Sequence, residues 1–109
     1  MVTLILFTVK RPIARALHEG GAADLTAFFN EQGVVPAFRN PRLTANNARH
    51  KQFCDMEARV PTEATQQFVK ALAERAEVEA VIFQANANSE TAFLYHHYKQ
   101  HPHKKVQCV

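Results

Sequence analysis

The sequence lacks the short motifs that mark several large enzyme classes. It has no GxxxxGK(S/T) phosphate-binding loop, no GxGxxG dinucleotide-binding loop, no GxSxG nucleophile turn and no HExxH zinc-binding helix. The usual signatures of phosphate-loop nucleotide hydrolysis, dinucleotide-dependent oxidation, serine hydrolysis and zinc proteolysis are therefore absent. Any function must be inferred from the placement of individual residues.

The chain also has no long apolar run and very little cysteine. The longest apolar run, residues 2–9, is far shorter than the roughly 20 residues that span a bilayer. No basic segment precedes this run, and residues 10–12 (KRP) follow it where a signal peptide would carry small residues, so a first strand is the better interpretation. Cys54 and Cys108 are the two cysteines and could pair. Without an export signal, we expect a reduced, cytoplasmic protein that does not engage a membrane.

The composition indicates one folded domain with a mild excess of positive charge. A chain of 109 residues is long enough for a single core, and 47% hydrophobic with 21% charged residues is ordinary for a globular protein. The net charge is +3, and six histidines add to it at mildly acidic pH. This excess permits an anionic partner without requiring one, so the positions of the charges must decide.

The clearest pattern is a strand, a helix and a second strand over residues 50–85. Apolar and polar side chains alternate over 52–60, as in a strand with one buried face. The apolar face carries Cys54, Met56, Ala58 and Val60, and the polar face carries Asp55, Glu57 and Arg59. Pro61 ends the strand, and Thr62 can cap the following helix. The apolar stripe of that helix consists of Ala64, Phe68, Val69, Leu72, Ala73 and Ala76. The run AVIFQA over 80–85 then suits a buried strand.

Two more strands are predicted in the first half of the chain. Residues 2–9 are apolar on both faces, which is typical of a strand in the middle of a sheet, covered at least in part on both sides. Residues 34–43 form a poorer strand, because Pro36 and Pro41 cannot donate to a ladder. This second strand can therefore lie only at an edge.

Two more helices are predicted, one between these two strands and one near the C-terminus. Residues 22–33 predict a helix with Leu25, Phe28 and Phe29 on its buried face, ended by Gly33. Ser89 can cap a helix over 90–100, with Phe93, Leu94, His97 and Tyr98 roughly on one side. The remaining HKKVQCV, residues 103–109, predicts a tail or a short added edge strand.

The order of elements predicts an α+β fold, the ferredoxin-like βαββαβ two-layer sandwich with sheet order 4-1-3-2. That order places the first and third strands centrally and the second at an edge, in agreement with their sequences. We assign residues 1–86 to the sandwich. Residues 87–109 form a C-terminal helical extension with a basic, histidine-rich tail in the same domain. A swapped or dimeric version of the sheet is left open.

A group of basic residues is the main candidate site. The topology brings the connections at 10–21 and 40–51 to the same end of the sheet, and Pro12 can begin a helical turn in the first of them. The basic residues of these connections are Lys10, Arg11, Arg15, Arg42, Arg49 and Lys51. Glu19 is the one acid among them. Forked guanidinium groups suit phosphate oxygens, so we predict an anion- or nucleic-acid-binding surface. The competing interpretation is that these charges only solvate exposed loops.

Histidines supply two weaker hypotheses. His97 and His101 stand four apart on one helix face, a spacing that can hold a transition metal, with His96, His103 and Cys108 nearby. No acidic base or CxxC pair completes this set, so we expect no metal and no cofactor. His18 and His50 come to the basic end, where histidine beside arginine could support metal-free RNA cleavage. Two histidines in basic loops are more often surface residues, so we assign no catalytic residue.

The layout is similar to several ferredoxin-like groups, including propeptide-type peptidase inhibitors, small-ligand regulatory domains and RNA-binding folds. This is a similarity of architecture only, and the sheet lacks the paired aromatics of an RNA-recognition motif. We expect a small non-catalytic binding or regulatory protein, comparable to phage or plasmid accessory inhibitors. Its basic loop end would engage nucleic acid or the nucleic-acid groove of a protein complex.

Two alternatives stay open. One is a small enzyme, either a dimeric ferredoxin-like barrel or a metal-independent nuclease. The other is a peptidase-type protein inhibitor. Formation of a homodimer is left open as well.

Overall fold

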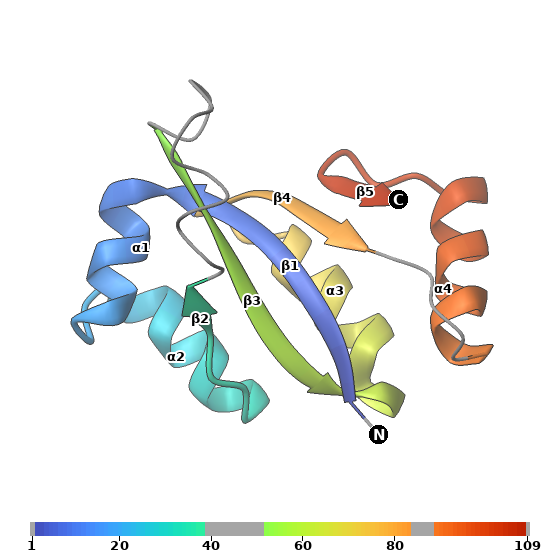
Figure 1. Ribbon diagram of the computed structural model, residues 1–109, viewed down its shortest axis with the longest axis horizontal. Coiled ribbons are helices and arrows are strands. Elements are labelled where there is room, and N and C mark those ends of the chain that lie inside the picture. Colours follow the sequence, from blue (N-terminus) through green and yellow to red (C-terminus); the bar gives the residue numbers. More distant parts are fainter. Residues whose placement is uncertain (1, 39–51, 84–88, 109) are drawn as a thin grey trace.

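The computed structural model describes residues 2–38, 52–83 and 89–108 (Figure 1). The strands are β1 (Val2–Lys10), β2 (Ala37–Phe38), β3 (Phe53–Pro61), β4 (Val78–Phe83) and β5 (Val106–Cys108). The helices are α1 (Arg11–His18), α2 (Ala23–Gln32), α3 (Thr65–Ala73) and α4 (Ser89–Gln100), with a 3-10 turn over Thr62–Ala64. The chain is therefore an α+β protein, as predicted. None of the helices in the described part is long and apolar enough to cross a membrane.

The sheet has five strands in the order β2-β3-β1-β4-β5. The predicted four-stranded sheet of order 4-1-3-2 is not what is observed, because residues 106–108 add a fifth strand parallel to β4. All other neighbours are antiparallel. β1 and β3 lie inside the sheet and β2 lies at one edge, but β4 is covered by β5 instead of forming the other edge. Of the predicted strand over 34–43, Ala37 and Phe38 pair with β3, and residues 39–43 lie outside the described residues.

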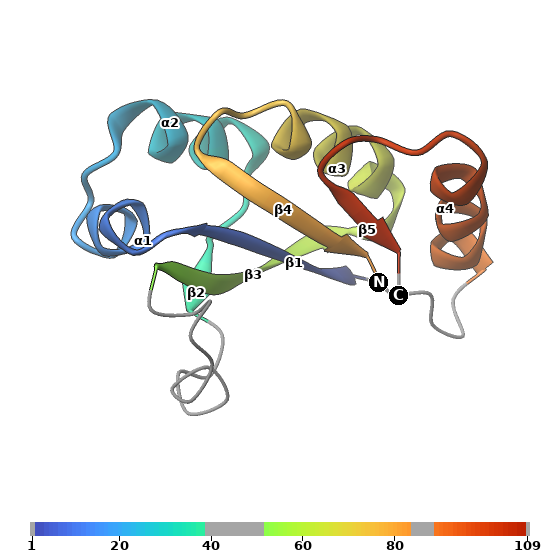
Figure 2. The same ribbon diagram turned by 90° about the horizontal axis from the view of Figure 1, so that it is seen from above.

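One face of the sheet packs against α2 and α3 (Figure 2). The core between these layers is built on aromatic rings: the centroid of Phe29 lies 5.5 Å from that of Phe7, and Phe28 stacks on Phe68 at 5.9 Å. Phe29 also lies 6.2 Å from Phe68, so the cluster joins β1, α2 and α3. The predicted buried stripes of both helices are thereby confirmed for these residues.

The opposite face of the sheet is only partly covered. Among the described residues no helix packs over it, and Val2 and Leu4 are 63% and 45% exposed (Figure 2). Leu6 and Thr8, further along β1 on the same face, are buried. The third strand alternates as predicted, with Met56, Ala58 and Val60 buried and Arg59 exposed. β1 is thus buried on both faces only in its second half.

The helix that follows β3 begins differently from its prediction. Thr62 was expected to cap the helix, but it starts a 3-10 turn with no side-chain cap, and its hydroxyl accepts a hydrogen bond from Thr3 at 3.3 Å. α3 then runs over Thr65–Ala73 and ends before Ala76. Gly33, in contrast, ends α2 as predicted, at a φ of 67° that favours glycine.

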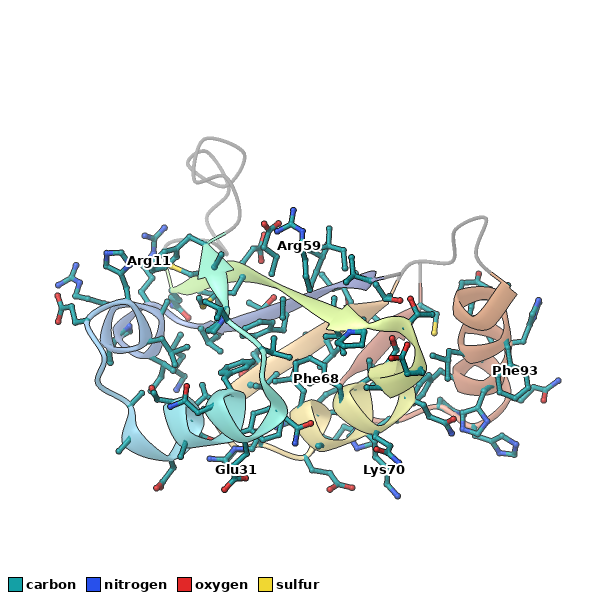
Figure 3. All side chains as sticks on the ribbon, turned by 90° about the horizontal axis from the view of Figure 1, so that it is seen from below. Arg11, Glu31, Arg59, Phe68, Lys70 and Phe93 are labelled. Atoms are coloured by element: carbon teal, nitrogen blue, oxygen red, sulfur yellow. The ribbon has the colours of Figure 1, made fainter. Side chains whose placement is uncertain are left out.

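The C-terminal elements are attached by a polar cluster at the turn before β4. The Arg75 guanidinium donates to Glu77 at 2.8 Å and lies 5.7 Å from the ring centroid of Phe28. The Lys105 ammonium donates to the carbonyl oxygen of Arg75 at 2.9 Å. In α4, Leu94 and Tyr98 are buried but Phe93 is 64% exposed, so the residues expected roughly on one side of this helix do not all face the core. Figure 3 shows Phe93 projecting from the outer side of α4, away from the sheet.

Truncation of the central ring should damage the core severely. We expect Phe68→Ala to lower the free energy of unfolding by about 3–5 kcal/mol, because the cavity adds to the lost transfer energy. Urea denaturation should show a lower midpoint with an unchanged slope. The matched control is Phe93→Ala, whose exposed ring should contribute less than about 0.5 kcal/mol. Equal effects of the two changes would contradict the assigned packing.

The Arg75–Glu77 pair should make stability depend on acid pH. Its hydrogen bond from Arg75 is the largest cause that lowers the pKa of Glu77. A carboxyl whose folded pKa is lowered contributes stability above its unfolded pKa of about 4.3 and loses it as pH falls through the folded pKa. Glu77→Gln should therefore cost about 0.5–1.5 kcal/mol at pH 7 and much less at pH 3. The exposed Glu79, changed to Gln, is the control; an equal cost of Glu77→Gln at both pH values would contradict the pair.

Candidate functional site

The basic end of the molecule is built where β1 passes directly into α1. Pro12 in the first turn suits a helix start, because it needs no hydrogen-bond partner there and its φ is already helical. The backbone N–H of Arg11 donates to the carbonyl oxygen of Gln52 at 2.9 Å. This bond ties the start of α1 to the residue that precedes β3. The predicted helical turn after β1 is thus a full two-turn helix at the end of the sheet.

A cleft of about 350 Å³ lies between α1, β2 and β3. It is lined by Arg11, Ala14, Arg15, His18, Glu19, Phe38 and Cys54. Arg11 and Arg15 stand one turn apart on α1, so both guanidinium groups reach the same hollow. Figure 3 shows Arg11 at the α1 end of the molecule, opposite the end where Phe93 projects from α4. The volume is in the lower part of the range for ligand-binding clefts.

The charge around this cleft is mainly positive. Lys10, Arg11 and Arg15 are exposed, and the first turn of α1 carries no acid. Because the helix N-terminus has a partial positive charge, it adds to the field of these side chains. Glu19 is the one acid among the described residues that line the cleft. The structure therefore brings Arg11 and Arg15 to one cleft, whereas Lys10 is exposed but is not among the residues that line it.

The remaining predicted basic residues cannot be placed. Arg42, Arg49 and Lys51 lie outside the described residues, as does His50. Their segment is flanked by Phe38 and Gln52, both of which contact α1 residues. The catalytic hypothesis for His18 with His50 therefore stays a prediction, as does the full extent of the basic surface.

An aromatic pair borders the cleft and was not predicted. The ring centroids of His18 and Phe38 lie 5.4 Å apart with planes tilted by 56°. Phe38 is 41% exposed, although a large apolar ring normally gains by burial. The sequence shows an aromatic residue, Phe38, in an edge segment interrupted by proline. It does not show that His18 lies beside this ring.

The same pair separates the basic cleft from a second hollow. This hollow has about 290 Å³ and is lined by Leu17, His18, Pro36, Ala37, Phe38 and Met56. His18 and Phe38 line both hollows, so a charged and an apolar compartment share one wall. Such an arrangement can take a ligand with an anionic part and a flat or apolar part.

Cys54 lies at the cleft instead of deep in the core. The alternation over 52–60 predicts Cys54 on the buried apolar face of its strand, yet it is only partly buried and its thiol is free. The reason is its place near the start of β3, where α1 covers it from one side and leaves the cleft on the other. Cys108 is also free, and its thiol contacts the carbonyl oxygen of Tyr95 at 3.9 Å.

The C-terminal histidines form a pair. The ring centroids of His97, in the last turn of α4, and His101, directly after the helix, lie 5.2 Å apart. Within residues 2–38, 52–83 and 89–108, no three histidine, cysteine or acidic side chains are grouped so that they could hold a metal ion. Among the described residues, the metal hypothesis for His97 and His101 therefore finds no third ligand.

Comparisons of the chain with protein-family models, with curated proteins and with solved structures found no match. The site must therefore be interpreted from its own chemistry.

The two thiols should differ in reactivity. Burial raises the pKa of the Cys108 thiol, which lowers the fraction of reactive thiolate. Cys54 borders a cleft that is open to solvent. We expect iodoacetamide at pH 8 to modify Cys54 in Cys108→Ala protein faster than Cys108 in Cys54→Ala protein. Faster reaction of Cys108 would contradict the burial assigned to β5.

Proposed function

We propose that the chain is a non-catalytic binding protein whose basic end contacts the phosphate backbone of a nucleic acid. The observation that carries this proposal is the convergence of Arg11 and Arg15 on one cleft whose position is fixed by the bond from the Arg11 N–H to Gln52. Lys10, the last residue of β1, is exposed and directly precedes α1 in the chain. Of the described residues that line the cleft, two are arginines and one, Glu19, is an acid.

The spacing of the two arginines supports phosphate binding. Residues four apart on a helix are separated by about 6 Å along its axis, which lets them contact neighbouring phosphates of one strand. A guanidinium group can donate two parallel hydrogen bonds to phosphate oxygens and is always charged. Binding of this kind depends on salt, because each contact releases counterions.

The groups around the cleft support binding more than catalysis. An active base is normally oriented by a hydrogen-bonding partner, whereas the His18 ring is positioned by packing on Phe38. A nuclease using His18 and His50 is the competing proposal. It predicts turnover, which a binding protein does not show.

We also infer a ferredoxin-like sandwich extended by a fifth strand. The neighbours β2–β3, β3–β1 and β1–β4 support this inference. The free thiols Cys54 and Cys108 are consistent with a reducing compartment such as the cytoplasm.

Removal of the basic side chains tests the function directly. A labelled oligothymidylate should bind the wild-type protein with a dissociation constant of about 1–100 µM at physiological salt. The double change Lys10→Gln with Arg15→Gln should weaken this binding by roughly tenfold for each lost contact. The slope of log affinity against log salt should fall by about one per contact. Fluorescence anisotropy at several salt concentrations measures both quantities.

A charge-matched control separates a site from net charge. Lys70→Gln with Lys104→Gln removes two exposed charges from α3 and from the turn before β5. Both double variants should unfold within about 0.5 kcal/mol of the wild type, since all four positions are exposed. Equal loss of affinity in the two variants would show that only net charge acts. Arg42→Gln with Arg49→Gln tests the rest of the predicted surface by the same measurement.

Two outcomes would redirect the proposal. No binding of any oligonucleotide, together with capture of a protein complex that survives nuclease treatment, would favour the nucleic-acid groove of a protein complex. Cleavage of the oligonucleotide that is lost in His18→Ala would favour the nuclease.

A further inference from the structure

We propose that Phe38, backed by His18, is a stacking platform for an unpaired base, and that the ligand is therefore single-stranded nucleic acid. This inference rests on the proposed function and names the form of nucleic acid that the same site takes. It is carried by the two adjoining hollows, one charged and one apolar, that share the Phe38–His18 wall.

The exposure of Phe38 is the first step. The rings of Phe7, Phe28, Phe29 and Phe68 are buried in the core. Phe38 keeps 41% of its surface exposed while lying beside two arginines that line the same cleft. An aromatic face next to guanidinium groups is the combination that single-strand binding proteins use: phosphates contact the cations and bases stack on the ring.

The position of the Phe38 ring is set by two neighbouring elements. Phe38 pairs across the sheet with Met56, so its backbone is held by β3. The ring centroid of His18, at the end of α1, lies 5.4 Å from that of Phe38, so the imidazole packs against the Phe38 ring. Arg15 precedes His18 by three residues on the same helix, so the phosphate contact and the residue that backs the platform both belong to α1. A platform held in this way loses little conformational freedom when a base stacks on it.

The shape of the apolar hollow is the third step. Its lining by Leu17, Pro36 and Met56 offers apolar contacts and few charges that would read a base edge. It suits the flat face of a base without strong sequence preference. In a duplex both faces of each base are covered by neighbouring pairs, so only an unpaired base can enter. The basic cleft next to it would hold the phosphate of the same nucleotide.

The test compares ring and charge variants on single-stranded and duplex probes. The probes are a labelled oligothymidylate, an oligouridylate and a duplex of the same length. Phe38→Leu keeps apolar bulk without the aromatic face and should weaken binding of both single strands about 5- to 100-fold, as expected for one lost stack. Its salt slope should stay unchanged, whereas Arg15→Gln should lower the slope by about one. Val35→Ala, at an exposed apolar position near β2, should leave affinity unchanged.

A second variant, Phe38→Trp, distinguishes a loss of binding from a loss of folding. The sequence contains no tryptophan, so Phe38→Trp introduces a unique fluorophore at the platform. This variant should bind the single strands at least as well as the wild type, and stacking should quench its fluorescence. Thermal melts of both Phe38 variants should match the wild type.

Each other outcome has a distinct meaning. Equal affinity for duplex and single strand with no effect of Phe38→Leu would overturn the platform and leave only phosphate contacts. Thymidine monophosphate that displaces the oligothymidylate with equal affinity would overturn the strand in favour of a free nucleotide. Absence of binding to all three probes would overturn the proposed function itself. A preference for the oligouridylate or the oligothymidylate would identify the strand as RNA or DNA and support the proposal.

Discussion

The register between β1 and β3 determines the position of almost everything else in this molecule. The two strands pair from Val2 opposite Pro61 to Lys10 opposite Phe53. This pairing sends Ile5, Phe7 and Val9 toward the helices. A slip of one residue would turn the buried set of β1 to the open face, so the burial of Phe7 fixes the register strongly. Because α1 starts where this ladder ends, the same register places the arginine cleft against β3.

Much of this architecture could be predicted from the sequence because it follows from simple periods. The alternation over 52–60 and the stripe that contains Phe68 are properties of single strands and helices. The structure confirms both for most of their residues, whereas Cys54 is only partly buried and Ala76 is exposed. Pro36, which predicts an edge position for its segment, also acts locally, and Ala37 and Phe38 do lie at the edge of the sheet. Such features need no knowledge of what lies next to them in space.

The features that the sequence left open or predicted incorrectly depend on tertiary contacts. A short added edge strand was one of the two structures expected for residues 103–109, but three residues show no readable period, so the sequence could not place β5 beside β4. Thr62 has the chemistry of a cap, but Thr3 on the adjacent strand occupies its hydroxyl instead. The exposure of Phe38 depends on its neighbours in α1 and β3, and no local sequence pattern identifies those neighbours. For the candidate site, the basic residues were therefore predictable, whereas the aromatic partner was not.

The added strand has a consequence for how the chain avoids self-association. β4 is apolar at Ala80, Val81 and Ile82, and without β5 its row of backbone donors and acceptors would be an open template for another strand. β5 occupies that row, and Lys105 anchors it through the Arg75 carbonyl group. The new outer edge is only three residues long, too short to recruit a neighbour efficiently. Local detachment of this segment, rather than global unfolding, is then the step that would open the sheet to aggregation.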